Sequence, residues 1–194
     1  MKIMYVDVET TGLKRDRHSI WQIAGIITDG VKEEEFNINI APYTDEPVSE
    51  VALEICGITK EKLYSFQPAE QAYIQFQSMI KRWVNPYDKS DKLYLCGYNA
   101  DYDGDFIRHF LMYNGDKYFG SYFWYPVLDV MHLASWYFVG QRTQFENFKL
   151  STVYKEVLGK PLVGAHDAFE DIKATRELLN ALIKDFDLFK RKKD

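Results

Sequence analysis

Apolar and polar positions divide the first forty residues into three predicted strands. Residues 2–8 form an apolar run rich in β-branched and aromatic side chains, which Thr-Thr-Gly at 10–12 interrupts. Residues 20–28 form a second run of this kind, and the Asp-Gly pair at 29–30 is a strong hairpin signal. Residues 34–40 then alternate polar and apolar positions, as a half-exposed strand does. The pattern therefore predicts an antiparallel meander.

Helical spacing dominates the rest of the chain. A short helix is expected over 49–55, where Gly57 stops it, and a longer one over 69–84, which Pro86 ends. One further buried strand is expected over 93–96. The remaining predicted helices span 103–113, 128–138, 151–158 and 168–186. This order predicts an α/β architecture, a mixed sheet with helices packed on it.

Length and charge limit the function classes. With 194 residues, the chain is long enough for one domain, which we place at 1–186, followed by a basic tail at 187–194. The 24 Lys and Arg residues face 29 Asp and Glu residues, a net charge of −5. This balance argues against a protein that wraps duplex DNA. It remains compatible with an enzyme that holds a short strand end, where bound divalent ions supply positive charge.

Cysteine usage and the start of the chain indicate the compartment. Cys56 and Cys96 lie in separate apolar runs and have neither the spacing of a metal site nor that of a disulfide framework. Met1 leads directly into the first strand pattern, without a basic region and cleavage site. No apolar run is long enough to span a membrane. We therefore expect a cytoplasmic protein with no membrane partner.

Asp7 and Glu9 lie two residues apart at the end of the first predicted strand. Residues at this spacing point to the same face of a strand, about 6.6 Å apart. Two acids on one face of a buried sheet repel each other and lose solvation, so they favour a bound cation, and oxygen ligands select Mg²⁺ or Mn²⁺. The alternative is an exposed strand end that carries two solvated acids.

Asp103 belongs to a second acidic segment, residues 97–103, between a predicted strand and a predicted helix. A carboxylate at a helix N-terminus is stabilised by the helix dipole and by free backbone N–H groups. Asp101 or Asp103 could therefore serve only as a cap. Asp105 is a third candidate in this turn, but it lies on a different side of the helix from Asp103.

Asp171 lies in a third segment, near the start of the last predicted helix. It shares a helix face with residues at three- and four-residue steps, namely Ala168, Thr175, Leu178 and Leu182. This face should pack on the sheet, where a lone carboxylate is costly. Asp167 and Glu170 more plausibly serve the helix N-terminus. His166 precedes the helix and can turn toward whatever Asp171 binds, although a histidine in a loop is more often structural.

Residues 7–12, 99–103 and 166–171 together resemble the three motifs of the DEDDh exonuclease family. This family includes the proofreading epsilon subunit of bacterial DNA polymerase III. The resemblance covers nearly the whole chain, and three further segments carry it: 21–24, 55–59 and 128–130. The departures, Tyr98 and Tyr102 where the family often has His and Phe, remove no ligand.

The resemblance implies a ribonuclease-H-like fold, a mixed five-stranded sheet with antiparallel first three strands, flanked by helices. It implies two Mg²⁺ or Mn²⁺ ions and a histidine that deprotonates the attacking water; this would be His166. The implied metal ligands are Asp7, Glu9, Asp103 and Asp171. The implied substrate-binding residues are Thr10, Thr11 and Gly12, which would line the pocket of the terminal nucleotide, Asn99, which would support the site, and Phe106. Phe106 would lie beside the terminal base, or else belong to the core.

The resemblance implies a metal-dependent 3′-5′ exonuclease that releases nucleoside 5′-monophosphates. We expect DNA 3′ ends, single-stranded or frayed, as substrates. The alternatives are an RNA 3′-trimming enzyme similar to RNase T or oligoribonuclease, and a catalytically silent binding module. A polymerase or sliding-clamp partner is also considered, because residues 185–189 loosely resemble clamp-docking peptides. The alternative for this segment is a helix end that packs its last apolar residues.

Overall fold

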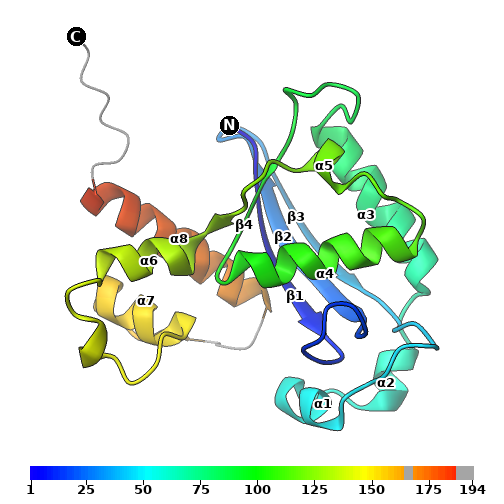
Figure 1. Ribbon diagram of the computed structural model, residues 1–194, viewed down its shortest axis with the longest axis horizontal. Helices are drawn as coiled ribbons and strands as arrows, with labels where there is room; N and C mark the ends of the chain where they lie inside the picture. The colour runs from blue at the N-terminus through cyan, green and yellow to red at the C-terminus, as the bar shows by residue number, and fades with distance from the viewer. Residues whose placement is uncertain (164–167, 187–194) are drawn as a thin grey trace.

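A five-stranded mixed sheet forms the centre of the protein, as the computed structural model shows (Figure 1). The structure describes residues 1–163 and 168–186. The strand order is β3-β2-β1-β4-β5, in which β1, β2 and β3 pair antiparallel and β4 and β5 add to β1 in parallel. The strands are β1 Ile3–Thr10, β2 Ile20–Thr28, β3 Glu33–Asn39, β4 Tyr94–Gly97 and β5 Leu128–Asp129. The predicted mixed sheet and its antiparallel first three strands are confirmed.

The turn between β2 and β3 confirms the hairpin signal. Gly30 has a φ of +94°, a conformation that glycine adopts without steric cost. The Asp29 carboxylate accepts hydrogen bonds from the backbone N–H groups of Val31 and Lys32, both at 2.8 Å. These bonds close the turn locally.

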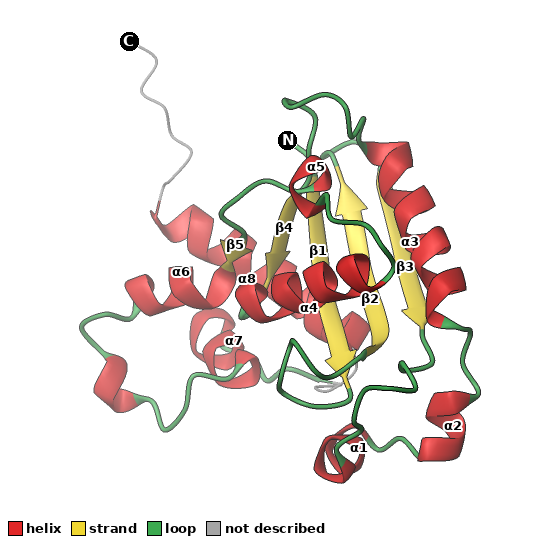
Figure 2. Ribbon diagram, turned by 45° about the vertical axis from the view of Figure 1, so that its right-hand side comes forward, coloured by secondary structure: helices red, strands yellow, loops and turns green. Residues whose placement is uncertain are grey.

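Helices cover both faces of the sheet, and the layering follows the alternation of side chains along the strands (Figure 2). Met4, Val6 and Val8 of β1 pack with α3 and α4 on one face. Ile3 and Tyr5 pack with α6, α7 and α8 on the other. The helices are α1 Glu50–Cys56, α2 Lys60–Tyr64, α3 Ala69–Trp83, α4 Ala100–Tyr113, α5 Phe119–Tyr122, α6 Val130–Tyr137, α7 Leu150–Leu158 and α8 Ala168–Phe186, with a 3₁₀ turn at Arg142–Gln144.

The predicted helix over 128–138 was wrong in its first two residues. Leu128 and Asp129 form β5, which pairs in parallel with Cys96 and Gly97 of β4. The Asp129 side chain then accepts hydrogen bonds from the N–H groups at the start of α6, so the helix begins at Val130, directly after its cap. A strand of two residues is too short to show a periodic pattern, and the helical pattern of the residues that follow was extended over it.

The predicted helix over 103–113 begins three residues earlier, at Ala100. Asn99 precedes it with a φ of +73°, a left-handed conformation that asparagine tolerates better than most residues. The short helices α2 and α5 were not predicted, since five and four residues give little periodic signal. Among the helices of the described chain, none has the length and apolarity that a membrane crossing requires.

The connection after β3 folds back beneath the ends of β1 and β2. There α1 and α2 pack around Trp21, Leu53 and Leu63 (Figure 1). The backbone N–H of Ser49 donates to the Thr11 carbonyl at 2.8 Å, which ties this segment to the loop after β1. The end of β1 is thus linked to the segment that leads into α1, while α4 and α8 contact β1 from the two faces of the sheet.

Candidate functional site

Asp7 and Glu9 continue the row of β1 side chains that faces α8. Ile3 and Tyr5 of this row are buried, whereas the two acids at its end are only partly buried. Ala24 and Gln22 of β2 lie opposite Asp7 and Glu9 in the sheet. The pairing register shifts after Glu9, which ends the regular ladder at this point. The sheet thus presents two carboxylates at the edge of its apolar core.

Asp103 reaches the same strand end from α4. Its side chain is buried, with 4% exposure, and its Oδ1 accepts a hydrogen bond from the backbone N–H of Val8 at 3.1 Å. The pKa of this carboxyl is raised to about 8, mainly by burial and to a smaller extent by the charges of Asp129 and Glu9, while the hydrogen bond from the Val8 N–H opposes the shift. The residue at the N-cap is Asn99. Asp103 therefore does more than cap a helix, because it binds across to β1.

Gly97 makes room for Asp103 at the end of β4. A Cβ atom at this position would lie 3.1 Å from the Val6 carbonyl oxygen and 3.2 Å from Asp103 Oδ2. Both separations are shorter than ordinary contacts, so any side chain here would displace the carboxylate or the strand. The glycine allows α4 to bring its acid close to β1.

Asp171 arrives from the opposite face of the sheet, on α8. The predicted buried face of this helix is confirmed, since the four residues that share it are all buried: Ala168, Thr175, Leu178 and Leu182. Asp171 lies partly buried near the N-terminal end of this face.

The pKa of Asp7 shows that the acids act on one another. It lies well above the usual range, first because of burial and then because of the negative charges of Asp103, Glu9 and Asp171. Acids from three distant segments therefore meet around Asp7. Such a set of hard oxygen donors fits a divalent cation, which would offset both the repulsion and the lost solvation.

The loop after β1 is closed by its own hydroxyl groups. Thr10 Oγ1 donates to the Gly12 carbonyl at 2.9 Å and shares a 2.8 Å hydrogen bond with Tyr102 Oη. Thr11 is fully buried, and its Oγ1 donates to the Pro47 carbonyl at 3.2 Å. Both threonine hydroxyls are thus bonded within the protein. Their predicted contact with a nucleotide stays a prediction.

The other predicted site residues have different placements. His166 lies outside the described residues. Asn99 is exposed, and its backbone N–H donates to Asp129 Oδ1 at 3.2 Å. Phe106 has no exposed surface and belongs to a core cluster, where its ring centroid lies 4.8 Å from that of Tyr102. This position corresponds to the core alternative for Phe106.

Cys56 is a neighbour of the site that the sequence did not identify as a site residue. Its thiol donates to Glu9 Oε2 at 3.2 Å, and burial together with the Glu9 charge raises the thiol pKa to about 12. Glu9 and Cys56 share a small hollow of about 160 Å³ with Trp21 and Phe169. A signal was available, because Cys56 belongs to the segment 55–59 that carries the family resemblance, but this segment does not indicate a contact with Glu9.

Two comparisons of sequence are consistent with this geometry. A family model described as "Exonuclease" matches residues 4–179. The chain is also 27% identical, over 180 residues, to a protein described as DNA polymerase III PolC-type from Halalkalibacterium halodurans. That match covers 92% of this chain and 11% of the polymerase, so the chain spans about a tenth of its relative.

Solved structures of Escherichia coli exonuclease I share the fold. A zinc-bound form in complex with single-stranded DNA superimposes with a TM-score of 0.74 and 22% identity. A complex with a dT13 oligonucleotide gives a TM-score of 0.70 and 21% identity. The matches cover 97% and 94% of this chain, respectively, and 41% of exonuclease I in both cases.

Proposed function

This chain belongs to the exonuclease family, and we propose that it removes nucleotides one at a time from the 3′ ends of nucleic acid. The reaction would hydrolyse the terminal phosphodiester bond, which leaves a 3′-hydroxyl on the shortened strand and releases a nucleoside 5′-monophosphate. The observation that carries this proposal is the meeting of Asp103, Glu9 and Asp171 around Asp7. Such a cluster is unfavourable for a protein that uses it only structurally.

The four carboxylates would hold two divalent cations, Mg²⁺ or Mn²⁺. Asp7 occupies the central position, because the charges of the other three acids all act on it. When bound, a pair of such ions stabilises the attacking and the leaving oxygen of an in-line displacement at phosphorus. The Val8 N–H would fix Asp103 through Oδ1, which leaves Oδ2 as the ligand atom.

His166 would accept the proton of the attacking water. An imidazole titrates near neutral pH, which suits a general base. The residue precedes α8, and Asp171 lies in the first turns of that helix. Under this proposal, His166 would lie near the metal ligand Asp171.

DNA is the substrate that we favour. The polymerase relative and the oligonucleotide-bound exonuclease I structures are both described in connection with DNA. The loop after Gly12 also carries Lys14, Arg15 and Arg17 in an otherwise acidic chain. Arg15 forms an ion pair with Asp105 of α4, which holds part of this basic loop over the helix that supplies Asp103. Phosphates upstream of the strand end would contact this loop.

A polymerase partner is a weaker part of the proposal. The matched region of the PolC-type relative belongs to a polymerase, which suggests that a domain of this kind can work beside one. The clamp-like segment 185–189 contributes little, since residues 187–189 lie outside the described part of the chain. Tyr137 donates a hydrogen bond to Asp185 at 2.9 Å, as expected if this helix end packs on the protein.

Digestion of three 5′-labelled substrates tests the proposal. Single-stranded DNA, duplex DNA with a mismatched 3′ end, and short RNA would be incubated with the protein and Mg²⁺. We expect labelled single-stranded DNA to shorten in one-nucleotide steps, with mononucleotides as the other product. Faster shortening of RNA would transfer the assignment to the RNA-trimming alternative. Binding of all three substrates without hydrolysis would favour the silent binding module.

A further inference from the structure

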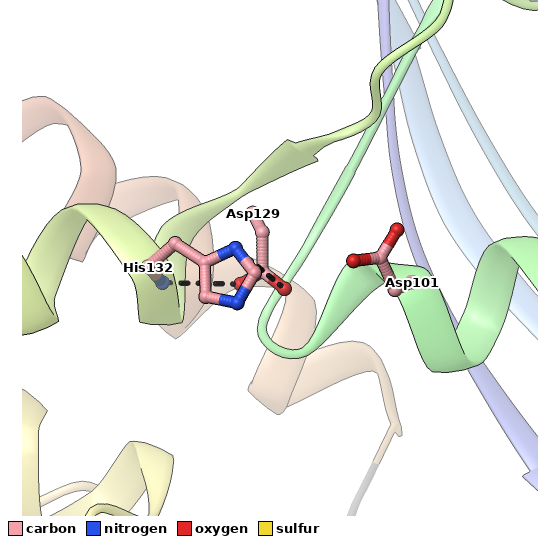
Figure 3. Close-up of side chains that lie close together, drawn as sticks. All are labelled: Asp101, Asp129 and His132. Carbon is pink, nitrogen blue, oxygen red and sulfur yellow. Dashed lines mark hydrogen bonds and ion pairs between the residues drawn. The ribbon is translucent and has the colours of Figure 1, made fainter.

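A second group of possible metal ligands lies where α4, β5 and α6 meet. Asp101 of α4, Asp129 at the end of β5 and His132 of α6 form this group, which we call the Asp101 cluster (Figure 3). It shares no residue with the four carboxylates around Asp7. Asp101 and His132 are exposed, so an ion could reach the cluster from solvent.

Asp129 provides the observation that points to a ligand. Its side chain is only 4% exposed. Oδ1 accepts hydrogen bonds from the backbone N–H groups of Met131 at 2.8 Å and Asn99 at 3.2 Å. Oδ2 is buried and has no hydrogen-bond partner among the described residues. A buried carboxylate oxygen without a partner costs free energy, so a water molecule or an ion is expected beside it.

His132 and Asp101 supply the other two possible ligand atoms of the cluster. His132 Nδ1 is 3.9 Å from Asp129 Oδ2, which is too far for a hydrogen bond but close enough for both atoms to bind one ion. Asp101 brings a second carboxylate, and its repulsion with Asp129 would be offset by a cation. One atom from each of the three residues lies within 4.8 Å of the other two.

These separations fit a metal after small movements of the side chains. Three atoms no more than 4.8 Å apart have a common point within about 2.8 Å of each, whereas bonds from Zn²⁺ to nitrogen or oxygen are about 2.0–2.2 Å. Rotation of the exposed Asp101 and His132 side chains can close this difference, while Asp129 stays fixed by its backbone hydrogen bonds. An imidazole with two carboxylates favours Zn²⁺ or a similar transition metal over Mg²⁺, which prefers oxygen ligands and keeps its waters.

We propose that Asp101, Asp129 and His132 form a binding site for a divalent transition metal such as Zn²⁺, separate from the four-carboxylate centre. The ion would connect the first turn of α4 to the first turn of α6, and solvent would complete its coordination. The inference does not require the proposed function, because none of the four acids around Asp7 is among its ligands; the charge of Asp129 does, however, act on Asp103.

Calorimetric titration with Zn²⁺ tests the site. The protein would first be saturated with Mg²⁺, so that the four-carboxylate centre is filled with the ion it is proposed to use. The wild-type chain would be compared with His132→Ala and Asp101→Asn, which change exposed side chains, and with Glu54→Gln as a control for the loss of one exposed carboxylate on α1. Asp129 would be left unchanged because it caps α6.

We expect wild type and Glu54→Gln to bind one Zn²⁺ more per chain than His132→Ala, and Asp101→Asn to bind that ion at least tenfold more weakly. Zn²⁺ should also raise the melting temperature of wild type more than that of His132→Ala. Equal stoichiometry and affinity in all four proteins would overturn the proposal and leave a water molecule as the partner of Asp129 Oδ2. Circular dichroism spectra that match wild type would show that a lost ion does not reflect unfolding.

Discussion

The protonation and the position of the Asp103 side chain both affect how it can bind a cation. Burial raises its pKa to about 8, while the Val8 N–H holds the carboxylate in place. A ligand that is partly protonated at neutral pH must release its proton when a metal binds. Cation binding and proton release at this residue are therefore coupled.

The same shift predicts how pH affects the metal-free protein. An aspartate has a pKa of about 3.9 in the unfolded chain, so between that pH and about 8 the folded state binds the proton more tightly. The free energy of unfolding should fall as pH rises through this window, by up to about 1.4 kcal/mol per pH unit for one proton. Asp7, whose pKa is also raised, should add to this slope, so Asp103→Asn should remove only the share that belongs to Asp103. Urea unfolding in EDTA at several pH values would measure the difference.

Glu54→Gln, a control on α1, should retain the wild-type slope. If Asp103→Asn also retains the full wild-type slope, Asp103 is not the group that takes up a proton on folding. Asp7 would then be the first candidate for that group, because its pKa is also raised.

His166 supports a separate prediction. If it acts as the general base, His166→Ala should lower turnover by about 10²- to 10⁴-fold and leave Mn²⁺ binding nearly unchanged. Steady-state kinetics and calorimetric Mn²⁺ titration on the same preparation would measure both quantities. Loss of Mn²⁺ binding in this variant would instead make His166 a metal ligand.

At the scale of elements, the site depends on three segments that end at one place. β1 supplies Asp7 and Glu9, α4 supplies Asp103 from one face of the sheet, and α8 supplies Asp171 from the other. The layered packing of Figure 2 brings them together.

The sequence predicted the strands and helices whose periodicity is long enough to read, including β1, β2, β3 and the buried face of α8. It did not predict β5, α2 or α5, because two to five residues carry little pattern. The sequence pointed to the four acids, and in the structure the charges of Asp103, Glu9 and Asp171 all raise the pKa of Asp7. The contact between Cys56 and Glu9 was not predictable, since it depends on how α1 packs beneath β1.

A substitution at Gly97 tests whether the close approach of α4 to β4 is needed for activity. Gly97→Ala should lower turnover by roughly tenfold or more, because the new methyl group would shift the Asp103 carboxylate by a few tenths of an ångström. Folding should survive, with a modest loss of thermal stability. Kinetic assays and thermal melts would separate the two effects.

Gly120→Ala is the matched control, since a Cβ there meets no atom within 4 Å. Wild-type turnover in Gly97→Ala would mean that the close approach at β4 has no part in catalysis.

At the scale of the whole molecule, one sheet carries two apolar cores and a polar end. The cores on its two faces are separate clusters, and the acids lie near the carboxyl end of β1, at the edge of these cores. The fold thus supplies a rigid base on which carboxylates can be held close together without unfolding the strand end. That residues 1–186 form a single domain with a basic tail stays a prediction, because 187–194 lie outside the described residues.

Restoration of activity by metal is the most direct test that the acids around Asp7 hold catalytic cations. Protein stripped with EDTA would be mixed with a 5′-labelled single-stranded oligonucleotide, and Mg²⁺ or Mn²⁺ would then be added in excess. We expect no shortening before the addition, stepwise shortening from the 3′ end after it, and none at any time with Asp7→Asn. Hydrolysis that continues in EDTA, or that Asp7→Asn sustains at the wild-type rate, would contradict this role for the four carboxylates.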